Sequence, residues 1–291
     1  MNPASPCDAP LQTPQTKPAK AARTMTVGRQ VKRMIVILAI LYVALAALLL
    51  ASADRILFQP PASRYVDDKD IFKLKTSDGT LISATYLASP SAKCTILFSH
   101  GNAEDLRDVF GDLVSMKNHG FSVLAYDYHG YGTSGGKPSE DNCYRDIDAA
   151  YEYLTQTRKI PPDRILVMGR SVGGGPAVDL AARKPVAGLI LESAFTSAFR
   201  VFWIGYAIPG DRFRNIDKIA KVTCPVLVVH GRNDSVVPFA HGQQLFAAAH
   251  EPKRCLWVDG GNHNDLPEVG GKRYDQALLD FVTLIESARK R

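Results

Sequence analysis

From about residue 70 to the end, short apolar runs alternate with stretches in which apolar residues recur at helical spacing. Unbroken apolar runs are typical of strands buried on both faces of a parallel sheet, and the intervening periodicity predicts helices on those faces. Before them, the segment 71–87 predicts a hairpin that turns at Asp78-Gly79. The later expected strands are 94–100, 121–128, 164–169, 188–193, 225–231 and 254–260, and the expected helices are 106–118, 141–156, 172–183, 239–250 and 275–289.

Right-handed crossovers place the carboxyl ends of such strands along one edge of the sheet, where folds of this kind hold their active sites. One segment, 194–221, does not follow the alternation and predicts a short cap at that edge. Its large apolar side chains either line an apolar groove or only pack the cap onto the body. They are Phe195, Phe199, Phe202, Trp203, Ile204 and Tyr206.

An uncharged run of twenty residues, 34–53, precedes the alternating part. As a helix it spans about 30 Å, the thickness of a bilayer core, and satisfies its own backbone hydrogen bonds there. It predicts a single-pass transmembrane helix (a signal anchor), followed by a linker over 54–69 and the globular domain over 70–291. The alternative is a signal peptide cleaved after Ala51-Ser52-Ala53. The length of the run and of the leader before it favours the anchor.

Basic charge is concentrated in the N-terminal tail, 1–33, where six Lys and Arg stand against Asp8 alone and give a net charge of +5. Prolines and a shortage of apolar residues predict that this tail is disordered. The remaining 258 residues carry only +1, so the basic balance does not indicate a nucleic-acid surface. Basic residues beside the helix orient it with the N-terminus in the cytoplasm and the catalytic domain outside it.

The five cysteines are widely spaced and form no CxxC pair. This pattern indicates neither a disulfide framework nor a structural zinc site. Cys94 and Cys255 fall in runs that predict buried strands. The chain also lacks the HExxH, P-loop and flavin fingerprints, so we expect no cofactor and no metal.

The stretch Gly169-Arg170-Ser171-Val172-Gly173 fits G-x-S-x-G between an expected strand and an expected helix. A strand that turns sharply into a helix strains the residue at the corner and leaves no room for neighbouring Cβ atoms, which explains the glycines. The corner serine then projects at a helix N-terminus, where free N–H groups stabilise negative charge. A phosphate-binding loop is the weaker interpretation, because no P-loop lysine follows.

A serine nucleophile needs a base, and the base needs an orienting carboxylate. Asp234 and His263 each follow an expected strand at the edge that carries Ser171, in the order serine, acid, histidine. Glu192 is an alternative acid, and Asp234 has the simpler interpretation of an Asx-turn residue. The expected oxyanion donors are the backbone N–H groups of Val172 and Asn102.

Five ordered motifs resemble the Bem46-like branch of the serine α/β-hydrolases, which includes enzymes that remove palmitate from protein cysteines. They are LFSHGNAEDL, AYDYHGYGTSGGKPSE, GRSVGGGPAVDLA, VTCPVLVVHGRNDSVVP and GGNHND. The resemblance covers roughly residues 70 to 290. It implies an α/β-hydrolase fold and places nucleophile, acid and base on Ser171, Asp234 and His263. One departure is His129, which stands where the family usually has arginine.

These observations together predict a membrane-anchored serine hydrolase that cleaves carboxylic esters or thioesters, with long-chain acyl groups as the suggested substrates. The expected partners are a small molecule, a lipid or an acylated protein as substrate, and the membrane through the N-terminal helix. Two alternatives stay open. One is a serine aminopeptidase-like amide hydrolase, and the other is a non-catalytic binding protein with a hydrolase fold.

Overall fold

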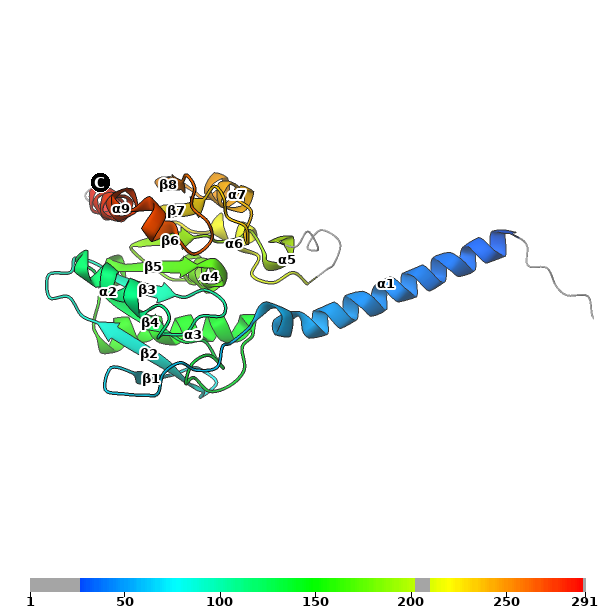
Figure 1. The fold of residues 1–291 in the computed structure, drawn as a ribbon, viewed down its shortest axis with the longest axis horizontal. Helices are drawn as coiled ribbons and strands as arrows, with labels where there is room; N and C mark the ends of the chain where they lie inside the picture. The colour runs from blue at the N-terminus through cyan, green and yellow to red at the C-terminus, as the bar shows by residue number, and fades with distance from the viewer. Residues whose placement is uncertain (1–26, 202–209, 290–291) are drawn as a thin grey trace, which may run out of the picture. The chain divides into compact units, whose positions relative to one another are not determined.

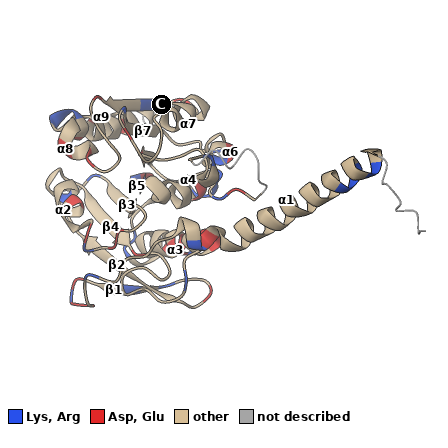
Figure 2. Cartoon of the chain, turned by 45° about the vertical axis from the view of Figure 1, so that its right-hand side comes forward, with Lys and Arg blue, Asp and Glu red and all other residues tan. Residues whose placement is uncertain are grey.

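The computed structural model describes residues 27–201 and 210–289 and divides the chain into two compact units between Leu45 and Ala46. Helix α1 (Val27–Leu57) begins in the first unit and is longer at both ends than the predicted 34–53. Figure 2 shows basic residues near its amino end and none along its apolar middle. By length and composition α1 could cross a membrane. The predicted tail over 1–26 lies outside the described residues.

An eight-stranded sheet forms the centre of the second unit, in the order β1-β2-β4-β3-β5-β6-β7-β8 (Figure 1). The first two strands form the predicted hairpin, and β2 also pairs antiparallel with β4. All other neighbouring strands pair in parallel, as the apolar runs predicted. The strands are β1 (Phe72–Lys75), β2 (Leu81–Leu87), β3 (Thr95–Ser99), β4 (Ser122–Tyr126), β5 (Ile165–Arg170), β6 (Gly188–Glu192), β7 (Val226–Gly231) and β8 (Lys253–Val258).

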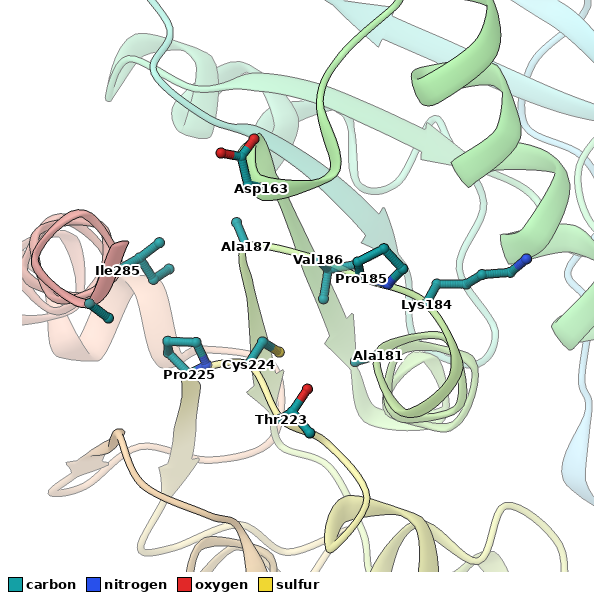
Figure 3. A pocket seen from close by; sticks show the side chains of 11 residues that line it. Asp163, Ala181, Lys184, Pro185, Val186, Ala187, Thr223, Cys224, Pro225 and Ile285 are labelled. Atoms are coloured by element: carbon teal, nitrogen blue, oxygen red, sulfur yellow. The ribbon is translucent and has the colours of Figure 1, made fainter. Parts of the chain in front are cut away.

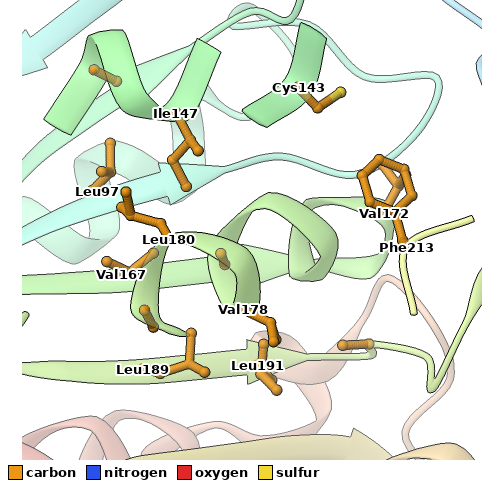
Figure 4. Packing of buried hydrophobic residues seen from close by; sticks show 14 of the residues in the cluster. Leu97, Cys143, Ile147, Val167, Val172, Val178, Leu180, Leu189, Leu191 and Phe213 are labelled. Carbon is orange, nitrogen blue, oxygen red and sulfur yellow. The ribbon is translucent and has the colours of Figure 1, made fainter. Parts of the chain in front are cut away.

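Two hydrophobic cores lie on opposite faces of this sheet. Alternate residues of β3 and β5 enter different cores: Leu97 and Val167 join one, while Phe98 and Met168 join the other. The first core is covered by α3 (Glu140–Glu152), α4 (Gly174–Arg183) and α7 (Ala240–Ala248), and Figure 4 shows its packing. The second is covered by α2 (Phe110–Asn118), α8 (Leu266–Gly270) and α9 (Lys272–Arg289). The predicted α/β-hydrolase architecture is therefore present.

Two local predictions need correction. Helix α2 begins at Phe110 rather than at Leu106, because the Asp105 carboxylate accepts the N–H groups of Arg107 and Asp108 and closes turns there instead. Cys255 is exposed, because β8 is the edge strand of the sheet and only part of it is covered. Cys94, in the central strand region, is buried as expected.

The segment 54–69, predicted as a linker, lies against the domain. Its first residues continue α1 to Leu57, and Phe58 is buried in the core beneath α3 and α4. Of the predicted cap, 194–221, the structure describes α5 (Ala198–Val201) and α6 (Asn215–Ile219). Phe195 is buried in the same core and Phe199 packs against it. The other four large apolar residues expected in the groove, Phe202, Trp203, Ile204 and Tyr206, lie outside the described residues.

Candidate active site

The strand-to-helix corner at Ser171 is as tight as the sequence predicted. Ser171 has φ of +53°, a left-handed conformation that a residue with a side chain rarely adopts. A Cβ atom on Gly169 would lie 2.3 Å from the carbonyl oxygen of Gly173, and one on Gly173 would lie 2.2 Å from that of Ser99. Only glycine fits at either position. The close backbone packing at these two glycines holds the serine at the start of a short 3₁₀ turn that leads into α4.

Three side chains from distant parts of the sequence form one hydrogen-bonded chain. Nε2 of His263 lies 3.0 Å from Oγ of Ser171, and Nδ1 of His263 lies 2.8 Å from Oδ2 of Asp234. They follow β5, β7 and β8, whose carboxyl ends share one edge of the parallel sheet. In such a chain the imidazole can take a proton from the hydroxyl, while the carboxylate fixes its tautomer.

Asp234 is held as an ionised acceptor. Its Oδ1 accepts the N–H groups of Val236 and Val237, at 2.9 and 2.8 Å, and Nε2 of the buried His230 lies 3.3 Å from Oδ2. Burial alone would raise the pKa of this carboxyl, but its hydrogen bonds with His230 and His263 hold it well below the usual range. The Asx turn considered from the sequence is present, and it orients the carboxylate toward His263.

The loop that carries His263 is fixed from both sides. Its carbonyl oxygen accepts a hydrogen bond from the Ser193 hydroxyl at 2.9 Å, just after β6. The amide oxygen of Asn262 accepts the N–H groups of Ser235 and His263, which joins the acid loop to the base loop. Asp265 accepts the N–H of Asn262 at 2.6 Å. These contacts hold the imidazole in place without using its two ring nitrogens.

Glu192, the alternative acid, belongs to a separate buried cluster. Its carboxylate accepts Nε of Arg170 at 2.6 Å and also the hydroxyl of Tyr274. Arg170 in turn lies 2.8 Å from Asp112 of α2. Burial alone would lower the pKa of Arg170, whereas the surrounding carboxylates, Glu192 first among them, raise it above the usual range. The sequence did not predict this cluster, since an arginine inside G-x-S-x-G carries no signal of its partners.

The two expected oxyanion donors lie on neighbouring segments. Val172 is in the 3₁₀ turn that opens the helical segment, where backbone N–H groups have no acceptor within the helix. Asn102 is on the loop after β3, and β3 pairs with β5 so that Ser99 is opposite Gly169. The structure thus brings the loop after β3 against the corner that carries Ser171.

This loop is itself braced by contacts of buried and partly buried side chains. Glu104 accepts the N–H of Gly101 at 2.7 Å and lies 3.7 Å from Arg170. Nε2 of His100 lies 3.2 Å from Asp127, which follows β4. Burial alone would lower the pKa of His100, and the Asp127 carboxylate raises it. The loop is therefore tied to both strands that flank β3.

A cavity of about 310 Å³ lies elsewhere (Figure 3). It is lined by residues that precede β6 and β7, among them Pro185, Val186 and Cys224. Burial raises the pKa of the Cys224 thiol to about 12. Since Ser171, Asp234 and His263 follow the carboxyl ends of their strands, this cavity lies at the opposite edge of the sheet and has no part in the site.

Comparison with known proteins identifies the family. The chain is 43% identical over 231 residues to alpha/beta hydrolase domain-containing protein 17B of Xenopus tropicalis, covering 76% of this chain and 78% of that protein. It is 42% identical to human protein 17B over the same shares, and 39% identical to protein 17C of Mus musculus, of which it covers 70%. The chain belongs to the serine α/β-hydrolases. Residues 90–203 match the family described as serine aminopeptidase, S33.

Solved structures agree with this hydrolase fold. The esterase Pf2001 of Pyrococcus furiosus superposes with a TM-score of 0.63 at 18% identity, covering 77% of this chain and 98% of that one. The monoacylglycerol lipase of Paleococcus ferrophilus gives 0.57 at 18% identity, with 70% and 99% covered. The branch predicted from the motifs is confirmed by the curated relatives, and the fold by these structures.

The departure at His129 has a structural counterpart in this hydrolase. Nδ1 of His129 lies 2.5 Å from Oδ1 of Asp146 on α3, and the backbone N–H of His129 donates to Oδ2 of Asp146 at 2.9 Å. Nε2 lies 3.4 Å from the carboxylate of Asp78 in the first hairpin. Burial alone would lower the pKa of His129, whereas the two carboxylates raise it. His129 thus braces the loop after β4 through contacts with α3 and the first hairpin.

Proposed function

We propose that this protein is a serine hydrolase that cleaves carboxylic esters or thioesters through an acyl-enzyme. The observation that carries the proposal is the continuous hydrogen-bonded chain from Asp234 through His263 to Ser171, with distances of 2.8 and 3.0 Å. Ser171 is the nucleophile, His263 the general base and acid, and Asp234 the orienting acid.

In the first half-reaction, Oγ of Ser171 bonds to the substrate carbonyl carbon as its proton passes to Nε2 of His263. The tetrahedral intermediate collapses, and His263 returns the proton to the departing alkoxide or thiolate. Water then repeats the cycle on the acyl-enzyme and releases the acid. The backbone N–H groups of Val172 and Asn102 stabilise the oxyanion in both halves, each by about 3 kcal/mol.

We further propose that the substrate carries a long acyl chain and that α1 anchors the enzyme in a membrane. The apolar length of α1 supports the anchor, and a helix that continues unbroken through Ala51-Ser52-Ala53 to Leu57 favours it over a cleaved signal peptide. Basic residues 29, 32 and 33 support an N-terminus in the cytoplasm and a catalytic domain outside it. An enzyme held at a bilayer meets acyl chains at high local concentration.

A second candidate is an aminopeptidase-like amide hydrolase, which the family match over residues 90–203 favours. The same nucleophile, base and oxyanion donors serve both reactions, since each passes through a tetrahedral intermediate. The two candidates differ only in the leaving group and the acyl group that the enzyme selects.

Fluorophosphonate labelling of the full chain tests the nucleophile. We expect the wild-type protein to label and Ser171→Ala not to label, because the reagent bonds to an activated serine oxygen. Ser91→Ala, at an exposed loop position before β3, is the matched control and should label like wild type. Equal labelling of wild type and Ser171→Ala would refute catalysis by Ser171.

Hydrolysis rates over a series of nitrophenyl esters, from acetyl to palmitoyl, test the substrate class. We expect kcat/KM to rise with chain length, because each buried methylene contributes about 0.8 kcal/mol of binding. A preference for acetyl over long chains would contradict the lipid-acyl proposal. Faster cleavage of aminoacyl amides than of any ester would favour the second candidate.

A further inference from the structure

The segment from Asp54 to Tyr65, which we call the connecting segment, leads from the apolar helix into the catalytic domain. Phe58 is only 3% exposed, and its ring meets that of Phe213 edge to face with centroids 5.9 Å apart. Asp54 lies 3.2 Å from Arg212. The segment is therefore seated on the same domain that holds Ser171.

The connecting segment bonds directly to the side chain of Asn102. The Nδ2 group of Asn102 donates to the carbonyl oxygen of Leu57 at 2.6 Å. Its Oδ1 accepts the backbone N–H of Gln59 at 3.0 Å and the hydroxyl of Tyr131 at 2.6 Å. Tyr131 also accepts the N–H of Gln59, at 3.2 Å, which closes a ring of hydrogen bonds around the amide.

Two more contacts extend this attachment along the loop after β3. The N–H of Arg64 donates to Oδ2 of Asp105 at 2.9 Å. The hydroxyl of Tyr65 donates to Asp127 at 2.5 Å, and Asp127 also accepts the N–H of Leu106. The loop from 100 to 108 thus has contacts with the connecting segment at Asn102 and Asp105 and through Asp127.

The backbone around Asn102 is not held in place by a regular helix or strand. Ala103 has φ of +57°, a conformation that costs a non-glycine residue of order 1 kcal/mol or more and persists only where neighbouring contacts impose it. The side chain of Asn102 supplies such contacts. An oxyanion donor must be aimed at the developing charge before the reaction, since reorganisation would reduce its effect.

We propose that the connecting segment is a positioning element of the active site, and that it aims the backbone N–H of Asn102 through that residue's side chain. Gln59 and Tyr131 are then positioning residues. Catalytic rate depends on the residues that follow the membrane helix, in addition to the triad. This inference rests on the proposed function, because it needs Asn102 to serve as an oxyanion donor.

The test compares full-length variants purified in detergent with wild type, using the best ester of the series and the rate of fluorophosphonate labelling. Asn102→Leu keeps the backbone N–H but removes all three side-chain hydrogen bonds. Gln59→Pro removes the N–H that the connecting segment donates, together with the long, exposed contact of the Gln59 side chain to the Ile56 carbonyl oxygen. We expect Asn102→Leu to lower kcat by about 10- to 100-fold and Gln59→Pro to lower it by about 10-fold. KM should change less than about threefold in both variants, because the donor acts on the transition state.

Matched controls distinguish a misoriented Asn102 N–H from a general loss of folding. Asn118→Leu changes an exposed asparagine at the end of α2, and Ala62→Pro adds a proline at an exposed position of the same segment. Both should keep the wild-type kcat. Tyr131→Phe, a milder change, should lower kcat about threefold even if Asn102→Leu fails to fold, since one of the two donors to Oδ1 is lost.

The outcomes are distinct. Loss of kcat and of labelling rate at unchanged KM and unfolding temperature supports the proposal. Wild-type kcat in folded Gln59→Pro and Tyr131→Phe overturns it while leaving the proposed function intact. A wild-type chain that neither labels nor cleaves any ester overturns both.

Discussion

At the scale of single residues, the site separates two carboxylates that the sequence left as competitors. Asp234 forms a hydrogen bond with His263, whereas Glu192 forms an ion pair with Arg170 and accepts a hydrogen bond from Tyr274. Glu192 ends β6 and Asp234 follows β7 at the same edge of the sheet, so their positions along the chain do not distinguish them. The side-chain partners do, because a carboxylate already committed to a buried guanidinium cannot orient an imidazole.

Paired substitutions test this assignment. Asp234→Asn should lower kcat by about 10⁴-fold, since the amide favours the wrong imidazole tautomer. Glu192→Gln should leave kcat within about threefold of wild type but lower the free energy of unfolding by about 3 kcal/mol, because it breaks a buried ion pair. Ester hydrolysis and urea unfolding measure the two effects. A large loss of kcat in Glu192→Gln with little change for Asp234→Asn would reverse the roles.

At the scale of elements, the loops after β3 and β4 are held by buried contacts between a histidine and a carboxylate. His100 joins Asp127 between these loops, and His129 joins the loop after β4 to Asp146 of α3. Since Tyr131 of the loop after β4 bonds to Asn102, the brace at His129 supports the loop after β3 as well.

The brace at His129 should make stability depend on pH. Its pKa is higher in the folded protein than in the unfolded chain, so its stabilisation is fully present below about pH 6.5 and is lost as pH rises through the folded value. We therefore expect the difference in unfolding temperature between wild type and His129→Gln to be larger at pH 6 than at pH 9.

The control for this experiment is His250→Gln, at an exposed histidine after α7 whose Nε2 lies 2.8 Å from the carbonyl oxygen of Ala220. Its difference from wild type should be small at both pH values. A difference for His129→Gln that grows toward pH 9 would mean that the histidine is neutral when it stabilises the fold.

At the scale of the whole molecule, the chain combines a long apolar helix with a hydrolase domain, and the boundary between its two compact units falls inside that helix. The last turns of α1 and the connecting segment belong to the unit that holds the triad. The proposed anchor and the proposed active site therefore share a stretch of chain, which is the physical basis for expecting that changes near the helix end affect rate.

The proposed topology can be measured with reporters fused to the C-terminus. We expect a reporter that works only outside the cytoplasm to be active, and one that works only inside to be silent, because the basic flank of α1 stays in the cytoplasm. Replacing Arg29, Lys32 and Arg33 by glutamate should reduce or reverse this pattern. An active cytoplasmic reporter on the unaltered chain would contradict the orientation.

Much of the fold was predictable because it follows from local pattern. Buried strands such as β3, β5 and β7 need unbroken apolar runs, and their alternation with helices implies a parallel sheet. The edge strand β8 contains a similar apolar run from Cys255 to Val258, and the exposure of Cys255 was missed because edge position is a property of the sheet. Likewise, α2 does not begin at Leu106 as predicted, because the Asp105 side chain forms hydrogen bonds that close turns there. The spacing of apolar residues does not indicate such side-chain hydrogen bonds.

The sequence by itself determined the strand-to-helix corner at Ser171, the order serine, acid, histidine, and the apolar helix, because each depends on residue types at short or ordered spacing. Only the tertiary structure decided which carboxylate meets His263, what replaces the arginine at position 129, and that the segment after α1 reaches Asn102. These are contacts of side chains with groups that lie far from them in sequence. Their partners are set by how the strands and loops pack, and no spacing along the chain records that.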